Sequence, residues 1–521
     1  MRCNCLRFRD IVWFALILCW CSSGWARAAE KSAAYRAAFD SITSADLMEY
    51  VVHLADAKLE GRQPGTRGGR AAAAYLAEQF AKLRLQPAGN VNGFEQPFPP
   101  HYCNVLGMIP GSDPELKDEV IVVGAHYDHI GYGRQGHSLG PYGKIHPGAD
   151  DNASGVSALM ELAKAFSFLP ESPKRSILLA AWDAEEDGML GSNYWISHPT
   201  APLEKIVAYF NMDMIGHLRD DRLYVYGWRS GCGWRRLVSG RNDELGLQLD
   251  FRWDLKPIAD YYPFFNRGVP VLMFHTGLHD NYHRPSDTAD TINGEGLSRV
   301  VRLLFGMVCE LAESNEKISY RKIAQRETPE TEKLFTRQAT PPAERLGVAL
   351  DPQPATDGGV YLVRVSAGSP ADKAGLKPGD RIIRCDGRQI HSDDELIGAV
   401  MSAESPLELV LQRKGEEKSA EISVELAGRP LRLGISWRVD EAEPSAIILT
   451  HVVPGSPAAR AGLQPGDRIY QVAGRDFIDE TAFLEMANSL PDPLELLVDR
   501  DGILRIVVIQ LRPAETLKRA A

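Results

Sequence analysis

Histidine and carboxylate residues that could bind metal recur in short clusters along the first part of the chain. Four of the clusters follow a run of apolar residues, and the other, Asp150 and Asp151, precedes a predicted helix. The clusters contain His126 and Asp128, Asp150 and Asp151, Glu185 and Glu186, Asp213, and His283. Taken singly, such groups are more often surface or helix-capping residues, and Asp151 or Asn152 could cap a helix. Five such clusters in one part of the chain make a chance arrangement improbable.

These side chains suit hydrolysis by a pair of metal ions. Zinc binds histidine nitrogen and carboxylate oxygen, and a catalytic zinc keeps one position open for water. Two metals can share a carboxylate, and a further carboxylate must carry the proton from water to the leaving group. The adjacent pair Glu185 and Glu186 could supply one base and one ligand. Asp128, two residues after His126, could orient that imidazole.

The elements around the clusters predict an α/β fold. Apolar runs predict strands at 120–125, 177–182, 206–212 and 269–274, and apolar spacing predicts a helix at 151–168. Continuous apolar strands that alternate with helices indicate a mostly parallel mixed sheet covered by helices on both faces. Sites form at the carboxyl ends of such strands, so we expect the clusters to meet at one edge.

The motifs AHYDHIG, GADDNASG, AAWDAEEDGMLGS, NMDMIG and YHRPSDT resemble those of the co-catalytic zinc aminopeptidase family, the clan of secreted bacterial leucine aminopeptidase, glutamate carboxypeptidase II and glutaminyl cyclase. All five motifs occur in the family's order. The resemblance covers residues from about 45 to 312.

The resemblance implies two zinc ions and assigns roles to the clusters. Asp150 would bridge the metals, and a cis peptide bond would follow it, between Asp150 and Asp151. One metal would be completed by Glu186 and His283, and the other by His126 and Asp213. Glu185 would be the general base, with Asp128 supporting a ligand. His279 is the alternative to His283 as metal ligand. The family's spacing before Asp287 favours His283.

Two features depart from the family or leave alternatives open. Ala259-Asp260-Tyr261 replaces the family's Ser-Asp-His before a group of aromatic residues expected to line the substrate pocket. These pocket residues are Tyr262, Phe264 and Phe265. A loop rich in histidine and glycine, residues 129–147, could be a lid over the site or an ordinary surface loop.

The C-terminal part of the chain contains an internal repeat. Gly368 to Ile382 reads GSPADKAGLKPGDRI, and Gly455 to Ile469 reads GSPAARAGLQPGDRI, 87 residues later. Both copies resemble the PDZ domains of exported bacterial proteases. The resemblance predicts PDZ domains at 341–426 and 428–513, after a polar linker at 313–340.

Two short glycine-containing segments of the repeats match the carboxylate-binding loop of PDZ domains. They are Leu346-Gly347-Val348 and Leu433-Gly434-Ile435. Such loops bind the C-terminus of a peptide through backbone N–H groups. The alternative is that one or both domains serve only packing or assembly. Asp380 and Asp467 are interpreted as turn residues.

Residues 1–28 have the pattern of a secretory signal. Its parts are the basic Arg2, Arg7 and Arg9, the apolar run Ile11–Cys21, and the small-x-small site Ala26-Arg27-Ala28. The run is too short to span a bilayer, which needs about 20 residues, so no stable membrane anchor is expected. These features predict an exported bacterial protein, either periplasmic or secreted. The predicted catalytic domain occupies residues 31–312.

The net charge of the chain limits the partners that it could bind. The formal net charge of −11 disfavours nucleic acid as a partner, which needs a basic surface. The predicted function is a metal-dependent exopeptidase, an aminopeptidase acting on peptides with a free N-terminus. The alternatives are a glutamate-type carboxypeptidase, a glutaminyl cyclase, and a non-catalytic protein that binds through its PDZ domains.

Overall fold

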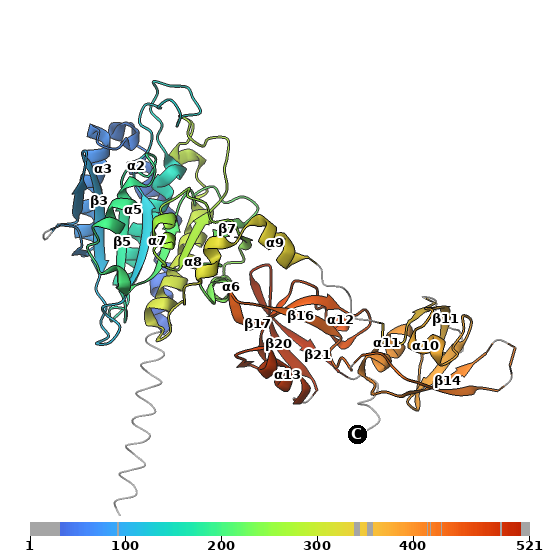
Figure 1. The fold of residues 1–521 in the computed structure, drawn as a ribbon. Helices are drawn as coiled ribbons and strands as arrows, with labels where there is room; N and C mark the ends of the chain where they lie inside the picture. Colours follow the sequence, from blue (N-terminus) through green and yellow to red (C-terminus); the bar gives the residue numbers. More distant parts are fainter. Residues whose placement is uncertain are drawn as a thin grey trace, which may run out of the picture. The chain divides into compact units, whose positions relative to one another are not determined.

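The computed structural model describes residues 32–90, 93–337, 344–351, 358–413, 415–416, 418–428, 430–489 and 492–511. They belong to two compact units, Met1–Thr331 and Glu332–Ala521 (Figure 1). The predicted signal segment, residues 1–28, lies outside the described residues. Within the described ranges, no helix is both long and apolar enough to cross a membrane.

The first unit is built on a nine-stranded mixed sheet in the order β1-β3-β5-β4-β6-β9-β7-β8, with β2 paired to β3. The strands are β1 (Gln86–Pro87), β2 (Glu95–Phe98), β3 (Tyr102–Ile109), β4 (Val120–His126), β5 (Ser176–Trp182), β6 (Ile206–Met212), β7 (Arg222–Tyr226), β8 (Gln248–Arg252) and β9 (Val271–His275). The central strands β5, β4, β6 and β9 are parallel. The predicted mostly parallel mixed sheet is therefore confirmed.

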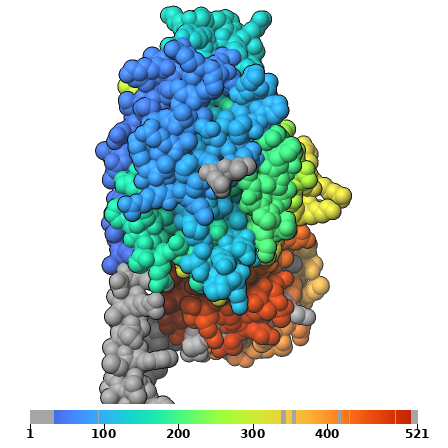
Figure 2. Space-filling model, turned by 90° about the vertical axis from the view of Figure 1, so that its left-hand side faces the viewer, coloured from blue at the N-terminus to red at the C-terminus, as the bar shows by residue number. Residues whose placement is uncertain are grey.

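Helices cover this sheet. Those of the first unit are α2 (Ser44–Leu54), α3 (Arg67–Lys82), α4 (Gly155–Ser167), α5 (Leu190–Ser197), α6 (Trp234–Arg241), α7 (Tyr261–Asn266) and α8 (Gly294–Glu313). Helix α4 packs on β4, β5 and β6, with α2 and α8 against it, whereas α7 packs on β6 and β9 beside α5. Figure 2 shows that the N-terminal segment, in blue, forms much of one side of this unit.

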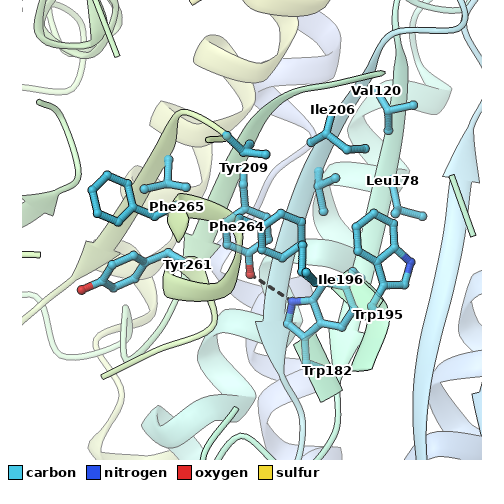
Figure 3. Packing of buried hydrophobic residues seen from close by; sticks show 14 of the residues in the cluster. Val120, Leu178, Trp182, Trp195, Ile196, Ile206, Tyr209, Tyr261, Phe264 and Phe265 are labelled. Atoms are coloured by element: carbon cyan, nitrogen blue, oxygen red, sulfur yellow. Dashed lines mark hydrogen bonds between the residues drawn. The ribbon is translucent and has the colours of Figure 1, made fainter. Parts of the chain in front are cut away.

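An aromatic cluster fills the space between the sheet and helices α5 and α7 (Figure 3). The ring of Phe264 stacks on that of Tyr209 with centroids 4.0 Å apart, and the Trp182 indole donates a hydrogen bond to the Tyr209 hydroxyl. Phe264 and Phe265 are buried here. The prediction that these two residues line the substrate pocket is therefore wrong, because both side chains belong to the hydrophobic core. Tyr262 is half-buried at its margin.

The helix predicted at 151–168 begins four residues later, at Gly155. Asp151 and Asn152 have non-helical backbone angles, and the Asn152 side chain accepts a hydrogen bond from the Gly155 amide at 3.0 Å. The cis peptide bond lies between Asp151 and Asn152. The prediction of a cis bond between Asp150 and Asp151 is therefore wrong by one residue.

The polar segment predicted as a linker, residues 313–340, contains two ordered elements. Residues Lys322–Arg326 form a 3-10 turn, and Pro329–Thr336 form α9. Glu327 binds both Arg229 (2.7 Å) and Arg321 (3.0 Å), and all three side chains are nearly fully buried. The first half of this segment is thus part of the first unit.

The second unit contains two six-stranded antiparallel sheets. The first domain has β10 (Val348–Leu350), β11 (Val360–Val365), α10 (Pro370–Lys373), β12 (Arg381–Cys385), β13 (Arg388–Gln389), α11 (Asp393–Ser402), β14 (Leu407–Gln412) and β15 (Ala420–Val424). The second has β16 (Ile435–Asp440), β17 (Glu443–Val452), α12 (Pro457–Arg460), β18 (Arg468–Val472), β19 (Arg475–Asp476), α13 (Glu480–Ser489), β20 (Leu494–Arg500) and β21 (Ile503–Ile509). The sequence repeat is therefore a structural repeat.

In each repeat, the glycine of the Leu-Gly loop lies against the serine of the Gly-Ser-Pro-Ala motif. Gly347 has φ +79°, and a Cβ there would lie 2.3 Å from the Cβ of Ser369. The equivalent Gly434 is equally close to Ser456, so each loop needs glycine at this position. The carboxylates of Asp380 and Asp467 each accept a hydrogen bond from the amide of the residue three positions earlier, as expected for turn residues.

Candidate metal centre

The predicted clusters meet at the carboxyl ends of the central strands. His126 ends β4, Glu185 and Glu186 follow β5, Asp213 follows β6, and His283 lies after β9. Parallel strands place their carboxyl ends at one edge of a sheet. The cluster is also buried: His126, Asp151 and Asp213 are each less than 10% exposed. Residues separated by more than 150 positions thus form one enclosed polar site.

Asp151 occupies the centre of the site. Its Oδ1 lies 3.3 Å from His126 Nε2, and its Oδ2 lies 3.0 Å from His283 Nε2. His126 Nε2 also lies 3.5 Å from Asp213 Oδ1, and His283 Nε2 lies 3.3 Å from Glu186 Oε2. Two groups that could each hold a metal ion therefore share the Asp151 carboxylate.

The prediction that Asp150 bridges the two groups is wrong. The amides of Asp150 and Asp151 both donate to the Asp287 carboxylate, but the two side chains have different partners. Asp150 Oδ1 accepts from the Gly216 amide at 2.6 Å, and its Oδ2 lies 3.1 Å from His279 Nε2. Asp150 and His279 thus lie together, outside the two groups that share Asp151.

Hydrogen bonds present the Nε2 atoms of both histidines to the carboxylates. His126 Nδ1 lies 3.2 Å from the Asp128 carbonyl, and His283 Nδ1 lies 2.6 Å from the His137 carbonyl. Each Nδ1 can therefore carry the proton and donate it, which leaves Nε2 as the metal-binding atom. The sequence did not indicate that a carbonyl of the 129–147 loop would orient His283.

The Asp128 carboxylate holds the turn that carries the two glutamates. It accepts hydrogen bonds from the amides of Glu185 (3.0 Å) and Glu186 (3.2 Å). Its distance to His126 Nδ1 is longer, at 3.7 Å. Asp128 therefore supports the site mainly by fixing the backbone of the two glutamates.

The 129–147 loop is attached to the site at several points. The Leu139 amide donates to the His283 carbonyl at 3.0 Å, and Arg134 forms an ion pair with Asp187 at 2.6 Å. His146 is buried and bonds to Ser138. The contacts with His283 make this loop a support for that histidine.

The charges of the site fit divalent cations. Burial, followed by the charges of Asp260, Asp213 and Glu186, raises the pKa of Glu185 well above its ordinary value, against the effect of His126. Burial opposes ionisation of Glu186 as well, but hydrogen bonds from His129 and His283 lower its pKa to about 2. Several carboxylates thus share a buried volume, which is costly unless cations compensate their charge. The donor set of nitrogen and oxygen atoms is one that zinc accepts.

Comparison with known proteins matches three parts of the chain to protein families. Residues 104–308 match the model of peptidase family M28. Residues 344–424 and 448–500 match models of the PDZ domain. This chain carries a peptidase family M28 domain followed by two PDZ domains.

Relatives of the M28 domain include aminopeptidases and probable glutamate carboxypeptidases. The chain is 27% identical over 231 residues to aminopeptidase YwaD of Bacillus subtilis, covering 41% of this chain and 46% of the relative. It is 30% identical over 169 residues to leupeptin-inactivating enzyme 1 of Streptomyces exfoliatus, covering 32% and 34%. It is 37% identical over 115 residues to a probable glutamate carboxypeptidase of Arthroderma benhamiae, covering 21% and 14%. The chain thus spans less than half the length of each relative.

Three residues of the first unit that sequence reasoning did not assign to the site contact or influence it. They are Arg62, His129 and Asp260. His129 stands three residues after His126 in the HYDH motif, so its position was a usable signal. Arg62 lies far from every motif, and nothing in its local sequence marks it.

The buried Arg62 guanidinium forms hydrogen bonds with both of the loops that carry metal-site residues. It donates to the carbonyls of Tyr127 (2.7 Å), Leu54 (2.6 Å), Pro147 (2.6 Å) and Gly148 (2.8 Å). The first follows His126, and the last two precede Asp150 and Asp151. Arginine suits this position because its planar fork can serve several acceptors at once.

We predict that Arg62→Met lowers the free energy of unfolding by at least about 3 kcal/mol, because each buried acceptor left unpaired costs about 1–3 kcal/mol. Arg62→Lys should restore little, since an ammonium group cannot reach all four carbonyls. Urea denaturation of the full chain measures both. Arg67→Met, at an exposed ion pair with Glu60, is the matched control and should change stability by less than about 1 kcal/mol. A wild-type midpoint for Arg62→Met would contradict this role.

Asp260 is a buried acid that acts on the predicted base. It accepts a hydrogen bond from Ser192 at 2.5 Å, and burial raises its pKa to about 7, against the effect of His126. Its negative charge raises the pKa of Glu185. Removing that charge should therefore lower the pKa of Glu185, which can act as a base only when deprotonated.

We accordingly predict that Asp260→Asn moves the acid limb of the kcat/KM profile to lower pH. The limb reports protonation of the base in the free enzyme. Asp254→Asn, at an acid paired with Lys256 in the preceding loop, is the control and should leave the limb in place. A shift of the limb to higher pH would show that Asp260 does not act through its charge on Glu185.

Proposed function

We propose that the chain is a zinc-dependent exopeptidase, an aminopeptidase that removes N-terminal residues from peptides with Glu185 as the general base. The observation that carries this proposal is the Asp151 carboxylate, which lies between the His126–Asp213 group and the His283–Glu186 group. A shared carboxylate of this kind suits two metals that act together. The names of two relatives, an aminopeptidase and a leupeptin-inactivating enzyme, support peptide substrates.

The residues of the site have different roles in the proposed hydrolysis. His126, Asp151 and Asp213 would hold one zinc, and Asp151, Glu186 and His283 the other. When bound, zinc supplies a polarised carbonyl and a water of lowered pKa. Glu185 accepts the proton of that water on its carboxylate and returns it to the leaving amine. Its buried position and raised pKa suit a group that must hold this proton between the two steps.

A glutamate-type carboxypeptidase is the second candidate, because one relative has that name. Such an enzyme needs free cations to bind an acidic substrate. Arg134 is engaged with Asp187, Arg219 with the carbonyls of residues 276–278, and Arg284 with the Leu139 carbonyl. These engaged arginines favour the aminopeptidase.

Mass spectrometry of the products distinguishes the candidates. The substrates are matched peptides with free and with N-acetylated N-termini, some of which begin with glutamine. Stepwise loss of N-terminal residues from the free peptides alone supports the aminopeptidase. Trimming from the C-terminus would make the enzyme a carboxypeptidase, and loss of ammonia from the glutamine peptides would make it a cyclase. Lack of turnover with zinc supplied would favour a PDZ-based binding protein.

We propose that the protein is exported, to the periplasm or beyond. The proposal rests on the sequence pattern of residues 1–28. N-terminal sequencing of the secreted or periplasmic fraction from a bacterial host is the test. A mature N-terminus after Ala28 is the expected result, and an intact chain retained in the cytoplasm would contradict it.

We also propose that the first PDZ domain binds peptide C-termini and that the second does not. A peptide would add to β16 beside α13 in the second domain. There, Trp437 of β16 donates a hydrogen bond to Glu480 of α13 at 2.8 Å, and its ring packs edge-on against Phe483. The Gly434 amide already donates to the Leu431 carbonyl. The side chain of Trp437 therefore spans the groove.

The first domain has smaller side chains at the equivalent positions, Leu350 for Trp437 and Leu396 for Phe483. We predict that a pool of N-acetylated peptides with free C-termini slows amide hydrogen exchange in β10 of the full chain, but not in β16. In Trp437→Ala, both strands should be protected. The same peptides with amidated C-termini are the control. Protection of β16 in the wild-type protein would contradict the prediction.

A further inference from the structure

We propose that His129 is a fourth protein ligand of the metal held by Asp151, Glu186 and His283. That site would then be closed, and the site of His126, Asp151 and Asp213 would be the one that keeps a position for water. The inference rests on the proposed two-metal function, and it goes further by assigning different tasks to the two metals.

The distances around His129 are those of a ligand set. Its Nδ1 lies 2.8 Å from Glu186 Oε1 and 3.9 Å from Asp151 Oδ2. The ring of His129 meets that of His283 at 76°, with centroids 5.6 Å apart. Zinc with bonds of about 2.0–2.2 Å in a tetrahedral arrangement separates its ligand atoms by about 3.3 Å. The donor atoms of these four residues all lie within 4.8 Å of one another.

The fold provides a dedicated place for this imidazole. The side chain of His129 is fully buried. Gly148 has φ +59°, and a Cβ there would lie 2.6 Å from the His129 ring, so glycine makes the room that the ring occupies. The His129 amide donates to the Arg62 carbonyl at 3.3 Å. The backbone thus holds His129 with its ring directed at the carboxylates.

Only one nitrogen of this ring is engaged. Nδ1 faces Glu186, whereas Nε2 is buried and has no hydrogen-bond partner among the described residues. Nδ1 is therefore the ring nitrogen that a metal beside Glu186 and Asp151 would meet.

The two sites then differ in ligand number. One has four protein donors, as in structural zinc sites, and the other has three, as in catalytic zinc sites. Glu185 belongs to neither group, so its carboxylate remains available as the base for a water at the three-donor site. The four-donor metal should bind first and more tightly.

X-ray absorption spectroscopy at the zinc edge tests this directly. Metal-free full-length protein receives one equivalent of zinc, and the multiple-scattering signal counts the imidazoles on that metal. We expect two imidazoles in the wild-type protein and one in His129→Gln. The exposed His198 supplies the control His198→Gln, which should keep two.

A single imidazole on the first equivalent in the wild-type protein would overturn the inference. It would mean either that His129 only bonds to Glu186 or that the other site fills first. The wild-type spectrum decides this even if His129→Gln folds poorly. A second equivalent that binds normally would leave the proposed two-metal function intact. Failure of any second equivalent to bind would instead count against that proposed function.

Discussion

Glu185→Gln is expected to lower kcat by about 10²–10⁴-fold, the usual contribution of a general base, while the protein retains its zinc. Glutamine has nearly the same shape but cannot accept the proton of water. Glu185 lies in neither of the two groups that share Asp151, so its replacement should leave both metals in place. Steady-state kinetics on a free-N-terminal peptide, with metal analysis of the same sample, measures both quantities.

Two further glutamates make this experiment specific. Glu186→Gln should lose metal along with activity, because Glu186 contacts His283 and His129 within the cluster. Glu204→Gln, at an exposed position, should change neither quantity. Wild-type turnover in a metal-loaded Glu185→Gln protein would show that another group carries the proton.

Asp151→Asn is expected to weaken both metal sites at once. Its two carboxylate oxygens face different histidines, His126 and His283, and an asparagine offers one neutral oxygen in place of two charged ones. We expect less than one equivalent of zinc after dialysis, against two for the wild-type protein, and turnover at background level. Metal analysis after equilibrium dialysis is the measurement.

Asp150→Asn is the matched control, one residue away. Asp150 accepts a hydrogen bond from Gly216, which an asparagine oxygen can also accept, so zinc content should stay close to that of the wild-type protein. If Asp150→Asn lost both metals and Asp151→Asn kept them, the assignment based on the sequence motif would be right and the geometric one wrong.

The sheet and its functional edge could be predicted from the sequence because they depend on long apolar runs. Val120–His126, Ser176–Trp182 and Ile206–Met212 are buried along their whole length, and such runs are typical of parallel strands covered on both faces. The clusters that end these strands must then share one edge, which is why the sequence predicted which clusters would meet.

The arrangement within the site could not be predicted because it depends on local backbone geometry. Asp150 and Asp151 are chemically identical neighbours, and only the turn through Asn152 and the hydrogen bonds to Asp287 decide which one lies at the centre. Arg62 acts through four backbone carbonyls, and a sequence does not show where carbonyls converge.

Two other outcomes depend on packing. The motif around Tyr262, Phe264 and Phe265 indicated aromatic residues near the site. Helix α7 packs on β6 and β9, however, and this packing buries Phe264 and Phe265 in the core. In the repeat, Trp437 and Leu350 occupy equivalent positions. Their difference in size is visible in the sequence, but the contact of Trp437 with Glu480 and Phe483 requires the structure.

Anomalous diffraction at the zinc edge, from crystals of the full chain grown with zinc, locates the metal ions relative to Asp151. We predict two peaks about 3.5–4 Å apart, as in other two-metal sites, one on each side of the Asp151 carboxylate. The first should lie beside His126 and Asp213, and the second beside Glu186 and His283. A single peak, or a peak between Asp150 and His279 with none at Asp151, would show that Asp151 is not shared by two metals.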